Sequence, residues 1–189
     1  DNLPTKDEHD VRLCISAGEP LPSDLLARWQ GTFGVDILDG LGTTEMLHIF
    51  VSNRPDEITP GSTGRVVPGY QIRLINDNNE VCAPGEMGVL EVSGPSSALM
   101  YWGQRQKTKD TFKGTWTRTG DNYSISEKGV MTYGGRNDDM LKVGGIYVSP
   151  FEVEAALIKH EAVLEAAVVG NNDQDGLVKP KGFIVLNKN

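Results

Sequence analysis

The stretch "GGRNDDMLKVGGIYVSPFEVEAAL" occupies residues 134–157 and indicates how the chain is organised. Its first half combines an arginine, two adjacent aspartates, a lysine and a glycine pair. Its second half predicts a helix, because Ser149, Pro150 and Glu152 stand at the N-cap, N1 and N3 positions of a capping box. The stretch therefore predicts a junction, in which a flexible charged turn is followed at once by a rigid element.

The sequence that precedes this junction predicts a strand, a helix and a second strand. Residues 11–22 predict a buried strand that breaks into a loop. Residues 23–34 predict a short helix that is capped at or near Ser23 and ended by one of its two glycines. Residues 35–46 predict another strand, which runs into a glycine-rich turn. This alternation of strand and helix is typical of an α/β domain.

Short strands with intervening turns dominate residues 62–133. Tyr70, Ile72 and Leu74 recur with a period of two, so they are expected on one face of a strand that ends in an asparagine-rich turn. A later pair of strands predicts a hairpin that turns at residues 128–129. This region is therefore expected to be a sheet-like or barrel-like β subdomain.

The sequence after the capping box predicts a helix and two further strands, at residues 163–170 and 182–186. Together with a β-hairpin they form a plausible small α+β unit. The expected fold class is thus α/β and α+β, with strand–loop elements and a β-rich subdomain joined to a small α+β domain.

The composition excludes several classes of protein. Hydrophobic residues are 38% and charged residues 23% of the chain, as in ordinary globular proteins, and no apolar run reaches the length of a membrane-spanning helix. A net charge of −8 argues against a nucleic-acid partner. The two cysteines form no disulfide framework, so a cytoplasmic location is expected. Both ends of the sequence look cut, and we expect a fragment of a longer protein.

One constellation able to carry chemistry is the run of residues 40–45, "GLGTTE". Glycines let the backbone approach a phosphate closely, hydroxyl groups donate to its oxygens, and the carboxylate of Glu45 can hold Mg²⁺. Taken alone, the run favours a strand-to-helix turn in which Thr43 or Thr44 caps the helix. Both interpretations stay open at this level.

Three other constellations are also ambiguous when each is taken alone. In residues 119–121 a carboxylate could accept from ribose hydroxyls, but an ordinary aspartate in a turn is the favoured interpretation. In residues 136–145 the charges could bind a ribose or phosphate, or form a solvated turn. Residues 17–20 indicate only a loop after a strand. No metal cluster, nucleophile elbow or P-loop signature is present in the sequence.

Taken together and in order, these motifs resemble the adenylate-forming superfamily of acyl-CoA ligases, luciferase-like enzymes and adenylation domains. "DGLGTTEM" is similar to its nucleotide motif, "TRTGD" to its ribose motif, and "GRNDDMLKVGGIYVSPFEVE" to its hinge and the start of its small domain. The longer stretches look most like the aryl-CoA ligases that act on benzoate-like acids. The resemblance implies that residues 1–137 end the large AMP-binding domain and that residues 138–189 begin the small mobile one.

The resemblance also implies a role for each matching residue. ATP or AMP would contact Gly18, Glu19, Pro20, Asp39, Gly40, Leu41, Gly42, Thr43, Thr44, Asp121 and Arg136. The catalytic residues would be Thr44 at the phosphate, Glu45 as the Mg²⁺ ligand and Lys142 in thioester formation. Asp138 would be the hinge, Gly144 and Gly145 would face the pantetheine arm of coenzyme A, and His48 and Ile49 would wall the acyl pocket.

The activity implied is that of an AMP-forming acid–thiol ligase, with ATP, Mg²⁺ and coenzyme A as cofactors and a carboxylic acid, expected to be aromatic, as substrate. Neither a nucleic acid nor a membrane is expected as a partner, and the intact enzyme could form a homodimer. The family's upstream phosphate loop and its C-terminal lysine are missing, so the chain alone is expected to be inactive. A medium-chain fatty acyl-CoA ligase and a non-catalytic domain that binds a nucleotide or a partner protein remain alternatives.

Overall fold

The computed structural model describes residues 4–174 and 177–187, and the chain divides into two compact units. The first unit comprises Asp1–Thr119 and Tyr123–Tyr133, and the second comprises Gly120–Asn122 and Gly134–Asn189. The domain boundary expected at residues 137 and 138 stays a prediction.

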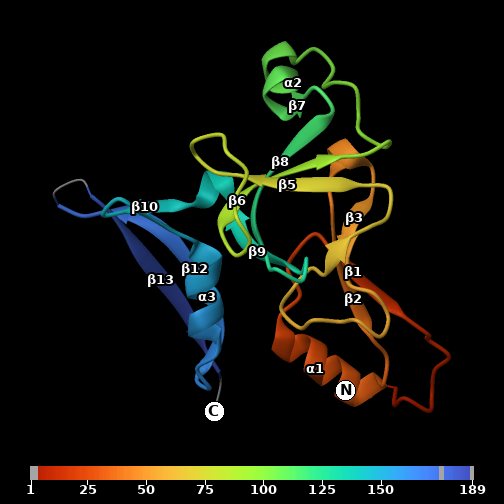
Figure 1. The fold of residues 1–189 in the computed structure, drawn as a ribbon. Coiled ribbons are helices and arrows are strands. Elements are labelled where there is room, and N and C mark those ends of the chain that lie inside the picture. Colours follow the sequence, from red (N-terminus) through yellow and green to blue (C-terminus); the bar gives the residue numbers. More distant parts are fainter. Residues whose placement is uncertain (1–3, 175–176, 188–189) are drawn as a thin grey trace. The chain divides into compact units, whose positions relative to one another are not determined.

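The first unit opens with a four-stranded sheet and one helix (Figure 1). Its elements are β1 (Cys14–Ala17), α1 (Ser23–Phe33), β2 (Ile37–Gly42), β3 (Ile49–Ser52) and β4 (Arg65–Val66). The strand order is β1-β2-β3-β4, in which β1 is parallel to β2 and the other pairs are antiparallel. A short 3₁₀ turn, η1 (Thr44–Met46), connects β2 to β3.

Two local predictions in this part were wrong. The first strand is not buried, since Ile15 is 67% exposed in β1, which is an edge strand of the sheet among the described residues. Ser23 does not cap α1, because the N-cap is Pro22 and no side chain caps this end. The glycine stop was predicted correctly: Gly34 has a φ of 65° and donates its N–H to the carbonyl of Gln30, which is a left-handed C-cap.

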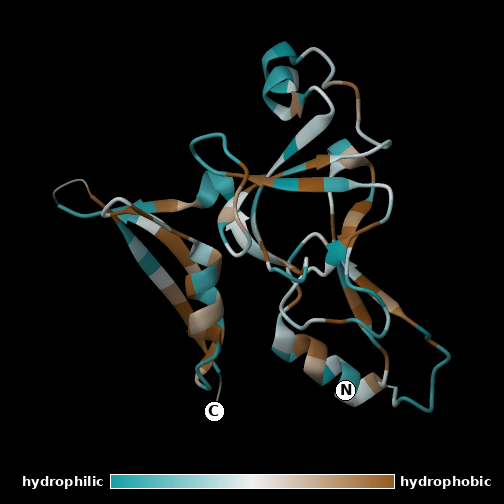
Figure 2. Cartoon of the chain, in the orientation of Figure 1, coloured by the Kyte–Doolittle hydropathy of each residue, from teal (hydrophilic) through white to brown (hydrophobic). Residues whose placement is uncertain are grey.

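A second sheet forms the β-rich part, as predicted. Its strands are β5 (Gln71–Ile75), β6 (Met87–Ser93), β7 (Phe112–Lys113), β8 (Trp116–Ile125) and β9 (Met131–Arg136), in the order β5-β6-β8-β7 with β9 paired to β8. The predicted hairpin turn is confirmed, since Gly129 has a φ of 73° and donates to the carbonyl of Ser126. Helix α2 (Arg105–Thr111) has no buried residue and is hydrophilic along its length (Figure 2).

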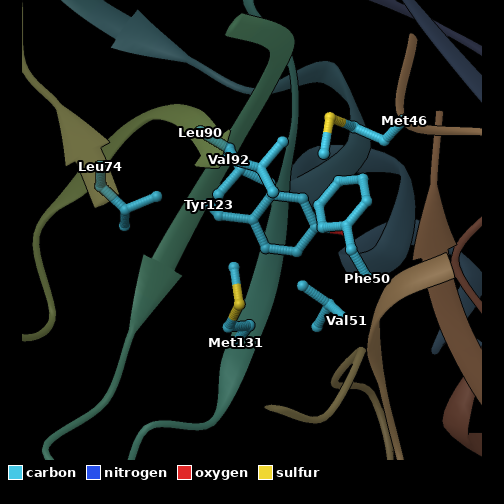
Figure 3. Close-up of a cluster of buried hydrophobic side chains, with 8 residues drawn as sticks. All are labelled: Met46, Phe50, Val51, Leu74, Leu90, Val92, Tyr123 and Met131. Carbon is cyan, nitrogen blue, oxygen red and sulfur yellow. The ribbon is translucent and has the colours of Figure 1, made fainter. Parts of the chain in front are cut away.

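The core of the first unit joins the two sheets around the 3₁₀ turn. Figure 3 shows its buried members, which are Met46, Phe50, Val51, Leu74, Leu90, Val92, Tyr123 and Met131. Tyr70 and Ile72 pack against this cluster from the same side as Leu74, which confirms the predicted strand face. Because Met46 is fully buried, its side chain anchors the turn that carries Glu45 to the core.

The second unit is a small α+β assembly. It contains a 3₁₀ turn, η2 (Asn137–Asp139), the strands β10 (Leu141–Val143) and β11 (Ile146–Val148), the helix α3 (Pro150–Ile158) and the strands β12 (Val163–Asn172) and β13 (Val178–Leu186). β10 pairs with β11 and β12 pairs with β13, both antiparallel. The capping residue was predicted correctly, because the buried Ser149 hydroxyl accepts from the N–H of Glu152 at 3.3 Å. The observed mixture of α/β and α+β parts confirms the expected fold class.

Helices long and apolar enough to cross a membrane do not occur among the described residues.

Candidate functional site

The carboxyl ends of two parallel strands place two predicted nucleotide segments side by side. Ala17 at the end of β1 is in register with Gly40 of β2, so the loop of residues 18–20 leaves the sheet beside residues 41–44. Ligands of open α/β sheets bind outside the carboxyl ends of their strands. Gly18 has a φ of 95°, a conformation that glycine adopts without strain. The structure thus brings these segments to the edge where a ligand is expected.

Gly42 of β2 is required for packing, and Gly40 is closely packed. A Cβ at Gly42 would lie 2.6 Å from the carbonyl oxygen of His48, which is too close for any side chain. A Cβ at Gly40 would lie 3.0 Å from side-chain atoms of Ile49. The register of β2 and β3 shifts between Leu41 and Gly42, so the two backbones approach closely where the turn begins.

The turn after β2 has the capped geometry that the sequence left as one of two interpretations. Thr43 is the N-cap of η1, and its hydroxyl accepts a hydrogen bond from the N–H of Met46 at 3.2 Å. The side chain of Thr44 is exposed, and that of Glu45 is half-buried in the first turn. Capping and phosphate contact are compatible here, because the cap engages Thr43 and leaves the exposed hydroxyl of Thr44 accessible.

Glu45 is held by Tyr101, whose hydroxyl donates to Oε1 of the carboxylate. Burial alone would raise the pKa of Glu45. The hydrogen bonds from Tyr101, the Glu45 backbone and Thr43, together with the charge of Lys107, outweigh burial and hold the pKa below its usual value. The carboxylate is therefore ionised at neutral pH and able to bind a cation. Burial and the bond to Glu45 raise the pKa of Tyr101, which keeps its proton available for this bond.

Asp39 is a buried carboxylate in the middle of β2. Its side chain is largely removed from water, and Oδ1 has no hydrogen-bond partner among the residues that the structure describes. Burial raises the pKa of Asp39 to about 6, although the N–H groups of Leu21 and Gly40 oppose the shift. An unsatisfied buried acceptor costs stability, so it is a candidate polar contact for a ligand at this edge.

His48 and Ile49, the predicted acyl-pocket residues, stand at the start of β3. His48 lies edge-on to Tyr70, with ring centroids 5.7 Å apart, and its Nε2 is 2.9 Å from the Tyr70 hydroxyl. Its Nδ1 is 2.7 Å from the carbonyl oxygen of Ile49. The Tyr70 hydroxyl also lies 2.7 Å from the hydroxyl of Ser96, so a hydrogen-bond network fixes the imidazole ring.

The second unit brings together the two residues expected at a ribose. Arg136 donates from Nη1 to Oδ1 of Asp121 at 2.9 Å. Asp121 is buried, whereas the Arg136 side chain is 46% exposed. A Cβ at Gly120 would lie 3.0 Å from Nη2 of Arg136, so the glycine between Thr119 and Asp121 makes room for the guanidinium group.

The remaining predicted residues lie in the exposed segment that follows. Asp138 is in the middle of the 3₁₀ turn η2. Lys142 on β10 is opposite Tyr147 on β11, and its Nζ is 5.7 Å from the centre of that ring. Gly144 and Gly145 have φ values of 57° and 88° and form the two-residue turn between these strands.

Sequence reasoning missed the residues that support the site from a distance. Tyr101 and Lys107 reach Glu45, and Tyr70 and Ser96 reach His48. Their partners are far away in the sequence and no local motif marks them. The strand period that places Tyr70 in the core was the one available signal, and it did not reveal the hydroxyl's partners.

Comparisons with protein families identify the chain. The model for the AMP-binding enzyme matches residues 2–102, which is more than half of the chain, and the model for the AMP-binding enzyme C-terminal domain matches residues 152–189. The chain belongs to the AMP-binding enzyme family. This result confirms the resemblance to adenylate-forming enzymes.

Several individual members of this family are similar to the chain over nearly its whole length. Benzoate–CoA ligase of Thauera aromatica is 60% identical over 98% of this chain and 35% of that protein. The crystal structure of a benzoate CoA ligase from Burkholderia xenovorans LB400 matches with a TM-score of 0.91 and 51% identity, over 99% of this chain and 37% of that one. The ATP-bound RpMatB-BxBclM chimera B3 matches with a TM-score of 0.90 and 32% identity, over 97% of this chain and 37% of the chimera. The chain spans about a third of the length of these relatives.

Proposed function

We propose that this chain is part of an ATP-dependent aryl-CoA ligase, which activates benzoate or a closely related aromatic acid and transfers it to coenzyme A. The observation that carries this proposal is the 60% identity to a benzoate–CoA ligase over 98% of the chain. Similarity of this extent favours an aromatic acid over the medium-chain fatty acids that the sequence had left as an alternative. It also favours an enzyme over a non-catalytic binding domain.

The reaction has two steps. First, a carboxylate oxygen of the acid attacks the α-phosphorus of ATP, a new P–O bond forms, and the bond to pyrophosphate breaks. Second, the sulfur of coenzyme A attacks the acyl carbon, the C–S bond forms, AMP leaves and the thiol proton is released. The first step brings two anions together, so the protein has to supply positive charge and hydrogen-bond donors where charge develops.

We assign the nucleotide to the residues around the ends of β1 and β2. The adenine lies against residues 18–20 and 39–43, and the exposed hydroxyl of Thr44 donates to the α-phosphate. Asp121 accepts from both ribose hydroxyls, and Arg136 holds that carboxylate in place. Support comes from the adjacency of the first two segments at the carboxyl ends of their strands and from the 2.9 Å bond of the second pair.

Magnesium fits the turn at Glu45. The carboxylate is ionised, and Mg²⁺ commonly takes one or two protein carboxylates together with substrate phosphates and water. A single ligand is therefore sufficient, and no group of three or more acidic, histidine or cysteine side chains that could hold a metal is found among the described residues. When bound, the ion would neutralise phosphate charge as the acid approaches.

The acid lies against His48 and Ile49 in this assignment. The imidazole has a polar neighbour within hydrogen-bonding distance of each ring nitrogen, the hydroxyl of Tyr70 and the carbonyl of Ile49. A ring fixed in this way offers a flat and rigid wall, which suits a planar aromatic acid better than a flexible chain. The network thus supports the aromatic substrate class.

The second step is assigned to the exposed segment of the second unit. The domain rotates about Asp138, Lys142 reaches the site for thioester formation, and Gly144 and Gly145 allow the thin pantetheine arm to pass close to the backbone. A rotating domain suits two steps that need different groups in one pocket. Support comes from the turn of η2 followed directly by a tight hairpin, which joins a short bend to a rigid element.

We propose a cytoplasmic location because the cysteines form no disulfide bond. Cys14 and Cys82 are both free, as expected for a protein of a reducing cytoplasm. The homodimer stays a prediction.

The test uses a hybrid enzyme in which this chain replaces the matching 35% of Thauera aromatica benzoate–CoA ligase. The RpMatB-BxBclM chimera B3 shows that a chimeric protein matching this fold can bind ATP. Release of pyrophosphate is measured against a panel of aromatic and straight-chain acids. We expect release with benzoate and ring-substituted benzoates and much less with aliphatic acids; a preference for aliphatic acids would overturn the substrate class.

A further inference from the structure

A short loop makes three hydrogen bonds to the turn that carries Glu45. We call residues 96–101 the clamp segment. Its Ser96 hydroxyl donates to the carbonyl of Met46 at 2.7 Å, and the N–H of Ala98 donates to the carbonyl of Glu45 at 2.7 Å. Its last residue, Tyr101, donates from its hydroxyl to Oε1 of Glu45. The same loop therefore holds both the backbone and the side chain of Glu45.

Tyr101 is itself fixed by its surroundings. Its backbone N–H donates to the hydroxyl of Thr108 in α2 at 3.0 Å. The ammonium group of Lys107 lies 4.1 Å above its ring, and the ring of Phe112 is 5.6 Å away. The half-buried ring consequently has neighbours on more than one side, and its hydroxyl is a donor with a defined position.

A defined donor matters for a glutamate because this side chain has several rotatable bonds, and ordering it costs conformational entropy. The bond from Tyr101 fixes the side chain before a ligand arrives. A carboxylate has about four lone-pair sites, so the bonds from Tyr101, Thr43 and the Glu45 backbone still leave capacity for a metal. Partners that orient a metal ligand in this way contribute to metal affinity without touching the metal.

We propose that Tyr101 is a positioning residue that holds Glu45 in the orientation needed to bind the Mg²⁺ that accompanies ATP, with the clamp segment as its support. The inference rests on the proposed function, because it takes Glu45 to be the metal ligand. Tyr101 lies outside the family motifs quoted from this sequence, so the motifs assign it no role.

The experiment measures binding of Mn²⁺, as a paramagnetic substitute for Mg²⁺, to the hybrid enzyme saturated with ATP and without an acid. Electron paramagnetic resonance gives the Mn²⁺ affinity, and a separate titration in EDTA gives the affinity for metal-free ATP. In Tyr101→Phe we expect Mn²⁺ affinity to fall by about tenfold, the scale found for such supporting partners. The affinity for metal-free ATP should be unchanged.

Two further variants separate positioning from general damage. Tyr123→Phe also removes a phenol hydroxyl, which lies 3.2 Å from that of Thr63 in the core, and should lower the melting temperature without changing Mn²⁺ affinity. In a Glu45→Gln background, Tyr101→Phe should have no further effect on Mn²⁺, because the two residues act as a unit.

The outcomes are distinguishable. Unchanged Mn²⁺ affinity in Tyr101→Phe, or an equal loss of affinity for metal-free ATP, would overturn the positioning role while leaving the ligase proposal intact. A further loss of Mn²⁺ affinity in the Glu45→Gln background would also overturn it. A native hybrid enzyme that binds neither ATP nor Mn²⁺ would overturn the proposed function, and the inference with it.

Discussion

Arg136 donates a hydrogen bond from Nη1 to Oδ1 of Asp121 across 2.9 Å, and the two side chains differ in exposure, at 46% and 9%. The carboxylate is thus held in place by a cation that remains partly in water. Such a carboxylate makes stronger hydrogen bonds to hydroxyl groups than a solvated one, because its charge is less screened.

Asp121→Ala in the hybrid enzyme should weaken the use of ATP. Loss of two charge-assisted hydrogen bonds to a ribose costs about 2–4 kcal/mol, so kcat/KM for ATP should fall by more than about tenfold. The native hybrid should discriminate strongly against 2′,3′-dideoxy-ATP, and the variant should lose little more with this analogue. A native enzyme that ignores the missing hydroxyls would refute the assignment of Asp121.

Lys142→Ala should slow thioester formation more than adenylation, since the assignment places Lys142 in the second step. Single-turnover measurements of the two half-reactions provide the test. Lys181→Ala is a matched control, because Lys181 also lies over an aromatic ring, that of Phe183, at 5.2 Å. Equal slowing of both half-reactions by Lys142→Ala would contradict the assignment.

Asp138→Pro should separate the two half-reactions. Proline at this position disfavours the helical conformation of the preceding residue, Asn137, which is in the 3₁₀ turn η2. We expect one half-reaction to persist near its normal rate and the other to fail, with little change in melting temperature. Asp138→Ala leaves the backbone unrestricted and should retain both. If both half-reactions fall together in a well-folded Asp138→Pro variant, the pivot lies elsewhere.

Asp39→Asn should stabilise the chain in a manner that depends on pH. The folded state raises the pKa of Asp39 from 3.8 to about 6, so it holds this proton more tightly than the unfolded state. The resulting stabilisation is complete below about pH 4 and is lost as the pH rises through about 6. Because asparagine stays neutral, the variant should match the native chain near pH 4 and exceed its stability at pH 8.

The gain at pH 8 should be at most about 3 kcal/mol, since each unit of pKa difference corresponds to about 1.36 kcal/mol. Urea denaturation followed by circular dichroism at the two pH values measures it. Asp77→Asn removes the same charge from the exposed turn after β5 and should show no such gain. A gain for Asp39→Asn that is equal at both pH values would mean that ionisation of this group is not the cause.

The sequence predicted those elements that local rules determine. Gly34 ends α1 and Ser149 caps α3, because a glycine in the left-handed region and a serine at an N-cap act within one helical turn. The cap of the turn after β2 also follows from a local rule, because the Thr43 hydroxyl accepts from the N–H of Met46 three residues later.

The features that the sequence did not predict correctly depend on residues far away in the sequence. β1 has the apolar composition of a buried strand, but its burial is decided by what covers it, and Ile15 is exposed. The contact between Tyr101 and Glu45 spans 56 residues of sequence, and the two side chains meet only in the folded chain. No period or spacing in the sequence could indicate that this hydroxyl is aimed at that carboxylate.

The most direct test of the central claim is the formation of benzoyl-CoA by the hybrid enzyme from benzoate, ATP and coenzyme A. We expect benzoyl-CoA, AMP and pyrophosphate in equal amounts, and no product when any one substrate is omitted or when the Thauera aromatica portion is tested without this chain. Release of ADP and phosphate in place of AMP and pyrophosphate, or a well-folded hybrid that binds ATP and benzoate but forms no adenylate, would contradict the claim that this chain serves an AMP-forming aryl-CoA ligase.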